Sequence, residues 1–449
     1  MRTFRIAAAL AAAATLAATA AAIPATAAVS GRSANHTKLA RINDPLATMG
    51  DQFGHGVAIN AAGTEAIVGA YESLGGNGRA YLYRSTHGVW STTPAATFSD
   101  PTGAGSHFGY SVALSPNGTT AYIGADHANI GARSAAGAVF VYKSSHGAWP
   151  KKPTLTINDP GAGSNDYFGV DVAVSPDGGT LAVGAPGTTL HSTFEVGAAY
   201  VYTASHGVLP KAPSASLDSP VSVRGFFGYN LSVSNNSRGK GVLVLGAYVT
   251  SVGSVSAEGA AYIYDSKSVH SWVLAKGGSL KDPGNLADDF FGGVVTIDGA
   301  GAQVLVGAQD ETEKGVGDAG AVFTYDLTAG KWHGPVQTLD GPANSAANFA
   351  SPAISTNGAI AVMGAGNEQV RGHNYAGEAF VYVGNGKTLV LGASIPDPTG
   401  GSPTGQEYFG APSAVSANGD ISVIAAPATT GSGGNPGPGA VYLYNTTPH

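Results

Sequence analysis

The residues best suited to chemistry lie in two loops rich in charge, within a chain that otherwise has few charged side chains. One loop, "QDETEKGVGDA" at 309–319, contains four acids. The other, "GNEQVRGHNYA" at 366–376, contains an acid, an arginine, a histidine and a tyrosine. Acids, a guanidinium and an aromatic ring are groups that hold polar ligands. The predicted binding residues are Asp310, Glu311, Asp318, Glu368, Arg371, His373 and Tyr375.

Three histidines recur in His-Gly dipeptides and raise the question of a metal site. They are His87, His146 and His206, in "STHGVW", "SSHGAW" and "ASHGVL". Because they come from successive copies of a repeat, we expect them to lie more than about 10 Å apart. Ligands of one ion lie only about 2.0–2.1 Å from it. We therefore interpret these histidines as turn residues and predict no metal there.

Known catalytic motifs are absent from the sequence. The chain has no cysteine, which excludes disulfides, thiol nucleophiles and thiolate metal sites. It has no H-E-x-x-H, phosphate-binding loop or dinucleotide fingerprint, and its Ser-x-Gly matches lack the strand–elbow–helix context of a hydrolase. Paired carboxylates, as a glycosidase requires, can come together from distant parts of a chain. A carbohydrate-active enzyme therefore stays an alternative.

A repeated unit must position these loops. Phe-Gly, or Phe-Ala in the sixth copy, opens seven units separated by 55 to 64 residues. "FGYSVALSPNGTTAYIGA" at 108–125 is typical: alternating apolar residues, a Pro-Asn-Gly turn and a second apolar run, which together predict a hairpin. The units begin at Phe53, Phe108, Phe168, Phe227, Phe291, Phe349 and Phe409.

Two further strands complete each unit. A third follows a variable loop in a constant style, as in "GAVFVY" at 137–142, and a fourth ends near Asp-Pro, as in "TLTINDP" at 154–160. Four strands per period of about 59 residues indicate a propeller rather than a solenoid. The first fourth-strand copy, "LARINDP" at 39–45, precedes every Phe-Gly unit, whereas the last unit ends at Tyr444 without one. We predict that the N-terminal strand completes the last blade, because closure hides sheet edges.

Phe-Gly, Gly-Ala and Gly-Ala-x-Tyr/Phe together resemble the FG-GAP repeats of the integrin alpha-chain propeller and its bacterial relatives. The resemblance covers about residues 39–444. It implies an all-β fold, a seven-bladed β-propeller of four-stranded blades, with the loops between second and third strands on a ligand-binding face. A fold of this kind hosts many activities, so it does not define the ligand.

The resemblance also raises the question of calcium, which several family members bind in the turn between the first and second strands. Calcium takes about six to eight oxygens, so several carboxylates must converge. Here "SPDGGT" at 175–180 offers only Asp177, "DGAGAQ" at 298–303 only Asp298, and "SANGD" at 416–420 only Asn418 and Asp420. We interpret these turns as plain hairpins and predict no cofactor.

The N-terminal sequence and the charge balance limit which classes of partner are expected. Arg2 and Arg5, an Ala-rich run and Ala25-Thr26-Ala27 form the layout of a signal peptide over residues 1–27. We expect a linker at 28–34 and the propeller at 35–449, with 35–45 as its closing strand. Without residues 1–27 the chain has 20 basic and 29 acidic residues, which argues against nucleic acid and against anionic membranes.

These observations predict a secreted, non-enzymatic propeller. We expect it to be extracellular, periplasmic or held at the cell surface. Its partner would be an extracellular protein or a glycan, bound by loops on one face, with no membrane insertion. Two alternatives remain: a secreted carbohydrate-active enzyme with carboxylates at the central channel, and a structural envelope protein that serves as a docking platform.

Overall fold

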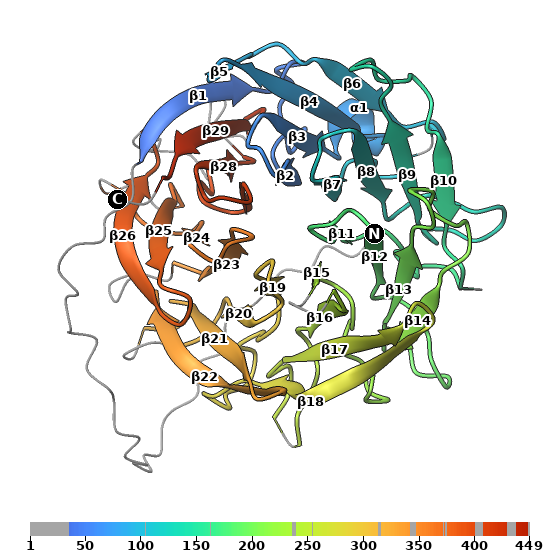
Figure 1. The fold of residues 1–449 in the computed structure, drawn as a ribbon, viewed down its shortest axis with the longest axis vertical. Coiled ribbons are helices and arrows are strands. Elements are labelled where there is room, and N and C mark those ends of the chain that lie inside the picture. Colours follow the sequence, from blue (N-terminus) through green and yellow to red (C-terminus); the bar gives the residue numbers. More distant parts are fainter. Residues whose placement is uncertain are drawn as a thin grey trace. The chain divides into compact units, whose positions relative to one another are not determined.

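The structure, a computed structural model, contains seven antiparallel sheets arranged as the blades of a propeller (Figure 1). It describes residues 36–447 apart from 104, 162, 236–238, 254, 313–315, 342–346, 371, 373–374, 400–406 and 429–436. The expected signal peptide and linker lie outside this range. Within the described residues, no helix is long and apolar enough to cross a membrane.

Each of the first four blades is built from consecutive strands, the innermost first. Blade 1 contains β2 (Val57–Ile59), β3 (Glu65–Ala70), β4 (Arg79–Thr86) and β6 (Ala96–Ser99), with the short β5 (Val89–Trp90) and the one-turn α1 (Ser73–Gly76). Blade 2 contains β7 (Val112–Leu114), β8 (Thr120–Ala125), β9 (Ala138–Lys143) and β10 (Leu155–Asn158). Blade 3 contains β11 (Val172–Val174), β12 (Thr180–Ala185), β13 (Ala198–Thr203) and β14 (Ala215–Asp218). Blade 4 contains β15 (Leu231–Asn235), β16 (Gly241–Ala247), β17 (Ala260–Ser268) and β18 (Ser271–Lys281).

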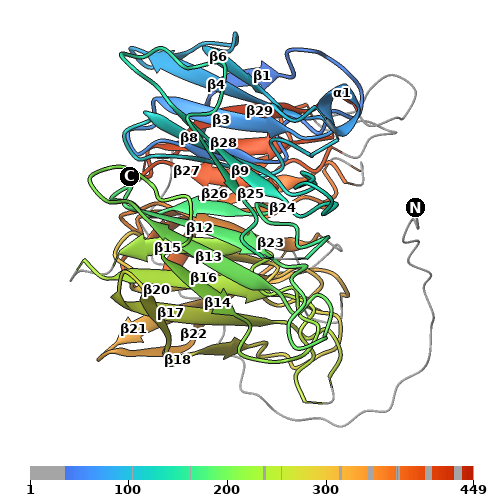
Figure 2. The same ribbon diagram turned by 90° about the vertical axis from the view of Figure 1, so that its right-hand side faces the viewer.

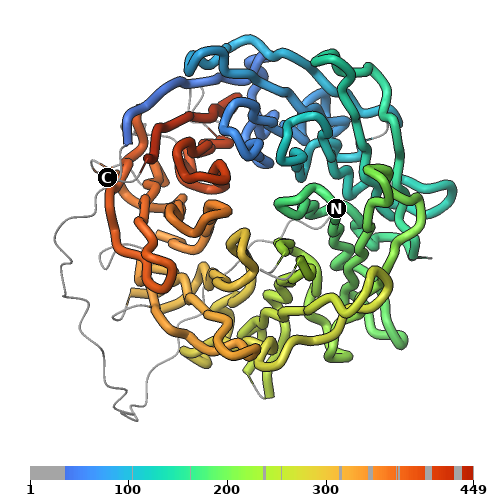
Figure 3. The backbone as a smooth tube through the Cα atoms, viewed as in Figure 1, coloured from blue at the N-terminus to red at the C-terminus, as the bar shows by residue number. Residues whose placement is uncertain are grey.

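The remaining blades follow the same order around the ring, as the chain trace in Figure 3 shows. Blade 5 contains β19 (Val294–Ile297), β20 (Gln303–Ala308), β21 (Ala321–Thr328) and β22 (Lys331–Asp340). Blade 6 contains β23 (Phe349–Ile354), β24 (Ile360–Ala365), β25 (Glu378–Gly384) and β26 (Leu389–Pro396). Blade 7 contains β27 (Ser413–Val415), β28 (Ile421–Ala426), β29 (Ala440–Asn445) and, as its outer strand, β1 (Thr37–Asn43).

The pairing of β1 with β29 closes the ring and confirms the prediction made from the displaced fourth strand. The two strands run antiparallel, with Ile42 opposite Val441 and Asn43 opposite Ala440. Ile42 is fully buried and packs in the core between blades 7 and 1. The N-terminal strand therefore covers an edge that would otherwise be open to pairing with another chain.

The Phe-Gly motif joins each blade to the one before it. Phe108 of blade 2 forms a parallel bridge to Gly78, the residue that precedes β4 of blade 1, and the same bridge recurs between Gly137 and Phe168. A Cβ on Gly78 would lie 2.0 Å from the Phe108 carbonyl oxygen, so glycine is required at this close approach. The seven repeat phenylalanines are at most 1% exposed and pack between blades. They act as packing anchors of the ring.

The recurring turns have a characteristic backbone conformation or are held by side-chain hydrogen bonds. His87, His146 and His206 are exposed and have φ near +50°, followed by a glycine that also has a positive φ, as type I′ turns require. They are turn residues, as predicted. In the first turns, Asp298 accepts hydrogen bonds from the backbone N–H groups of Ala302 and Gln303. The expectation that no calcium binds there stays a prediction.

Candidate functional site

One face of the ring carries two sets of loops that form the candidate site. The 4–1 loops run from the fourth strand of one blade to the first strand of the next, and the 2–3 loops follow the Gly-Ala end of each second strand. Figure 2 shows the disc edge-on, with α1, part of a 2–3 loop, at one side. The strand order places both loop sets on this same side.

Every 4–1 loop ends in the same unusual backbone conformation. The residue before each repeat phenylalanine has a φ between +50° and +56°, a left-handed conformation that side chains other than glycine seldom adopt. Five of these seven residues have aromatic rings, counting histidine. The seven are Gln52, His107, Tyr167, Phe226, Phe290, Asn348 and Tyr408.

Rings from blades 1, 2 and 3 meet in a continuous cluster, which we call the aromatic patch. Its members are His55, Tyr71, His107, Tyr110, His127 and Tyr167, all half-buried. The ring centroids of His55 and Tyr71 are 4.6 Å apart, those of Tyr71 and Tyr110 5.0 Å, and those of Tyr71 and His107 5.2 Å. The His127 ring continues the cluster to Tyr167, at 5.2 Å.

A second group of rings on blades 4 and 5 extends the patch. The Tyr248 ring lies 4.5 Å from that of Tyr229 and 5.8 Å from those of both Phe226 and Phe290. The Tyr229 and Tyr110 hydroxyls share a hydrogen bond, which links the two groups. Together they place aromatic side chains over five consecutive blades.

Burial keeps three members of the patch, His55, Tyr71 and Tyr110, in their neutral forms. Burial raises the pKa of Tyr71 to about 12 and that of Tyr110 well above its usual range, so both hydroxyls stay neutral donors. Burial lowers the pKa of His55, which is therefore a neutral imidazole near pH 7. His55 Nδ1 lies 3.1 Å from the Tyr110 carbonyl oxygen. Because a carbonyl only accepts, Nδ1 carries the proton and Nε2 is left as an acceptor.

The patch opens into the central channel. A cavity of about 480 Å³ is lined by the inner strands of all seven blades, and His55, Tyr110 and Tyr229 belong to its wall. Asp171 is the one carboxylate among the described lining residues. Burial raises its pKa to about 7, although the backbone N–H groups of Leu231 and Val172 donate to it.

Pairs of buried acids recur in four of the 4–1 loops. In each pair the aspartate of Asp-Pro meets an acid two residues before the repeat phenylalanine, and no member is more than 5% exposed. The pairs are Asp44/Asp51, Asp159/Asp166, Asp282/Asp289 and Asp397/Glu407. Arg133 Nη1 donates to Asp159 Oδ2 at 2.6 Å, and the Thr399 hydroxyl bonds both Asp397 and Glu407.

The Asp-Pro aspartates also stabilise the turns that follow them. Asp44 accepts the backbone N–H of Leu46, Asp159 that of Gly161, and Asp282 that of Gly284. The second acid of each pair was not foreseen. Its signal was an acid at a fixed place before four of the seven phenylalanines.

The structure brings the two predicted binding loops together through Asn348. Its Nδ2 donates to Asp310 Oδ1 at 2.8 Å, and its Oδ1 accepts a hydrogen bond from Asn367 Nδ2. Asp310 is half-buried and Asp318 is exposed. Burial and the nearby Asp318 raise the pKa of Asp310 to about 6.

The other predicted residues of these loops lie in different surroundings. Glu311 is buried, and its carboxylate lies within 4.8 Å of those of Asp282 and Asp289. Glu368 is half-buried. Tyr375 is 40% exposed, with its ring 6.0 Å from that of Tyr408. Arg371 and His373 lie outside the described residues. The binding role of these loops stays a prediction.

Comparison with known proteins agrees with the fold. Residues 149–202 match the FG-GAP repeat family, a segment that spans the outer strand of blade 2 and the first three strands of blade 3. No match to a curated protein was found. The chain therefore contains an FG-GAP repeat and folds as a seven-bladed β-propeller, a fold often used for ligand binding.

Proposed function

We propose that the chain is a secreted binding protein that recognises a carbohydrate through the aromatic patch. The observation that carries this proposal is the connected set of half-buried rings from His55 to Tyr167. Aromatic rings present an apolar face to the C–H groups of a sugar, while tyrosine hydroxyls supply polar contacts at the ring edge. Export rests on the expected signal peptide over residues 1–27.

The polar atoms of the patch suit a ligand with many hydroxyl groups. His55 Nε2 accepts a hydrogen bond, and the hydroxyls of Tyr71 and Tyr110 donate. Pockets that bind small ligands combine such apolar walls with a few polar groups of this kind. We do not propose hydrolysis of the sugar, because glycosidases use two carboxylates and Asp171 is the single one among the described residues of the channel wall.

A glycan array tests this proposal. The chain without residues 1–27 should bind a defined set of glycans, and Tyr71→Ala and Tyr167→Ala should each weaken binding about tenfold, as the loss of an anchor residue commonly does. Phe194→Ala is the control, since Phe194 is an exposed aromatic residue of a 2–3 loop outside the aromatic patch. An array on which the wild type binds nothing, while it captures an extracellular protein, would contradict recognition of carbohydrate.

A further inference from the structure

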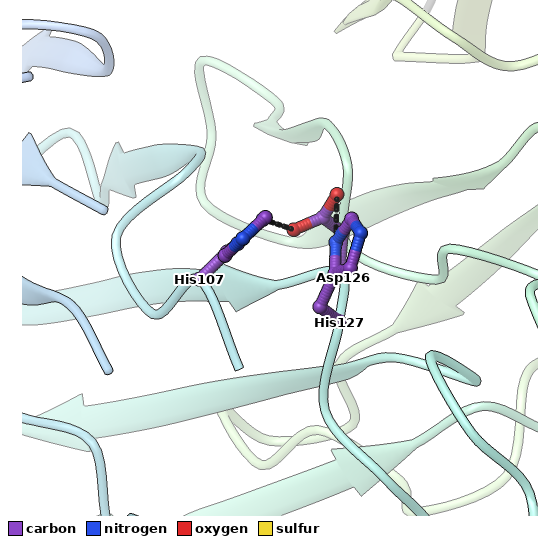
Figure 4. A group of neighbouring side chains, drawn as sticks. All are labelled: His107, Asp126 and His127. Carbon is purple, nitrogen blue, oxygen red and sulfur yellow. Dashed lines mark ion pairs between the residues drawn. The ribbon is translucent and has the colours of Figure 1, made fainter. Parts of the chain in front are cut away.

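His107, Asp126 and His127 converge within the aromatic patch in a way that the rings alone do not explain. Asp126 and His127 directly follow β8, and His107 ends the preceding 4–1 loop. His107 Nδ1 lies 3.6 Å from Asp126 Oδ1, and His127 Nδ1 lies 3.0 Å from Asp126 Oδ2. Figure 4 shows the carboxylate between the two imidazoles, with one oxygen directed at each ring.

The polar atoms at the centre of this group are buried and lie close to one another. The Asp126 side chain is 5% exposed, and Asp126 Oδ1, His107 Nδ1 and His127 Nδ1 are each buried without a hydrogen bond of acceptable geometry. A buried carboxylate oxygen in this state is costly. The two imidazole Nδ1 atoms and the carboxylate therefore converge on one place, where an ion can contact all three side chains.

From this geometry we infer that His107, Asp126 and His127 bind a divalent transition-metal ion of the zinc type. All three ligand atoms lie within 4.8 Å of one another. Four-coordinate zinc with bonds of about 2.0–2.1 Å separates its ligands by about 3.3 Å, close to the 3.6 Å and 3.0 Å contacts observed. Two imidazoles and one carboxylate are donors that favour zinc and similar ions over calcium, which takes oxygen ligands.

The surroundings leave room for a further ligand. The His107 side chain is 23% exposed and that of His127 is 39% exposed, so the ion would be reached from the loop face. Sites with three protein ligands and an open position are the pattern of zinc centres that contact an outside molecule. At this position a hydroxyl or carboxylate of a bound molecule would become the fourth ligand.

The combination is specific to blade 2. The equivalent residues of blade 1 are Gln52, Tyr71 and Glu72, and those of blade 5 are Phe290, Gln309 and Asp310. No other blade has a histidine at either of the two positions that His107 and His127 occupy. The site is therefore not a by-product of the repeat that generates the scaffold.

Zinc titration tests the inference without any glycan, so that its outcome does not depend on the proposed function. The chain without residues 1–27 is stripped with a chelator and titrated with ZnCl₂ by calorimetry. We expect one equivalent to bind, and the melting temperature to rise with added zinc, because an ion that binds only the folded state stabilises it. A wild type that binds no zinc at millimolar concentration would overturn the inference.

Variants locate the ion. His107→Ala and His127→Ala should each weaken zinc binding about tenfold or more, and both side chains are exposed enough for folding to survive their loss. His146→Ala removes an exposed turn histidine of the same blade and should change nothing. Equal zinc affinity in all three variants, or an equal loss in His146→Ala, would place the ion elsewhere and reject the site.

Discussion

Gly69 of blade 1 and Gly109 of blade 2 are in such close contact that a Cβ on Gly69 would lie 1.9 Å from the Gly109 carbonyl oxygen. Gly69 belongs to the Gly-Ala end of β3, and Gly109 follows the repeat phenylalanine of the next blade with a φ of +92°. The Gly-Ala and Phe-Gly dipeptides of the repeat meet in this way at five of the seven blade boundaries. Their glycines let the backbones of neighbouring sheets touch.

Gly69→Ala should therefore destabilise the ring. The backbone, not a flexible side chain, must move to admit the methyl group, and overpacking of this kind costs about 1–3 kcal/mol of the free energy of unfolding. Chemical denaturation measures the change. Gly317→Ala is the control, because a Cβ there meets no atom within 4 Å. Equal stability of the two variants would show that the close approach is not needed.

Ring closure predicts a large effect from one residue of β1. Ile42→Ala should cost about 2–5 kcal/mol of the free energy of unfolding, because Ile42 is fully buried between blades 7 and 1. Lys38→Ala, on the exposed end of the same strand, should cost little. Deleting residues 35–45 should expose β29 and cause association in sedimentation experiments. A deletion variant that stays monomeric and melts like the intact chain would contradict closure by β1.

Lowering the pH should increase the free energy of unfolding through protonation of Asp289. Burial and the charge of Asp282 raise the folded-state pKa of Asp289 to about 7, whereas its unfolded value is about 3.9. The folded state then holds a proton that the unfolded state lacks, so this contribution is present below about pH 4 and is lost as the pH rises through 7. Asp289→Asn should flatten the fall in stability between pH 5 and pH 8.

Unfolding free energies measured at both pH values test this effect. Relative to the wild type, Asp289→Asn should gain on the order of 1–2 kcal/mol of unfolding free energy between pH 5 and pH 8, because only the wild type loses the contribution of the bound proton. Asp218→Asn, at an exposed carboxylate on β14, is the control. If Asp289→Asn follows the pH profile of the wild type, Asp289 is not held protonated by its neighbours.

The fold was predictable because the repeat encodes it several times. Seven Phe-Gly units and a displaced fourth strand were enough to predict the blades and the closure by β1. The aromatic patch was not predictable, because its members come from different loops of the repeat in three blades. His55 follows Phe-Gly, Tyr71 follows Gly-Ala, and His107 precedes Phe-Gly. Only the left-handed backbone at His107 and the curvature of the ring bring them together.

Charge in a loop was an incomplete guide to a site. Glu311 belongs to an acidic loop that predicts an exposed binding residue, yet it is buried near Asp282 and Asp289. Sequence alone does not distinguish an acid that faces solvent from one that pairs with a neighbouring loop. The prediction for Tyr375, in contrast, concerns a side chain that is accessible.

A crystal structure of the chain with the glycan that binds most tightly on the array tests most directly whether the aromatic patch recognises carbohydrate. The account predicts a sugar ring stacked on Tyr71 or Tyr110, with a hydroxyl group within hydrogen-bond distance of His55 Nε2. Glycan density over the 309–319 and 366–376 loops, next to Tyr375, with the aromatic patch empty, would contradict it.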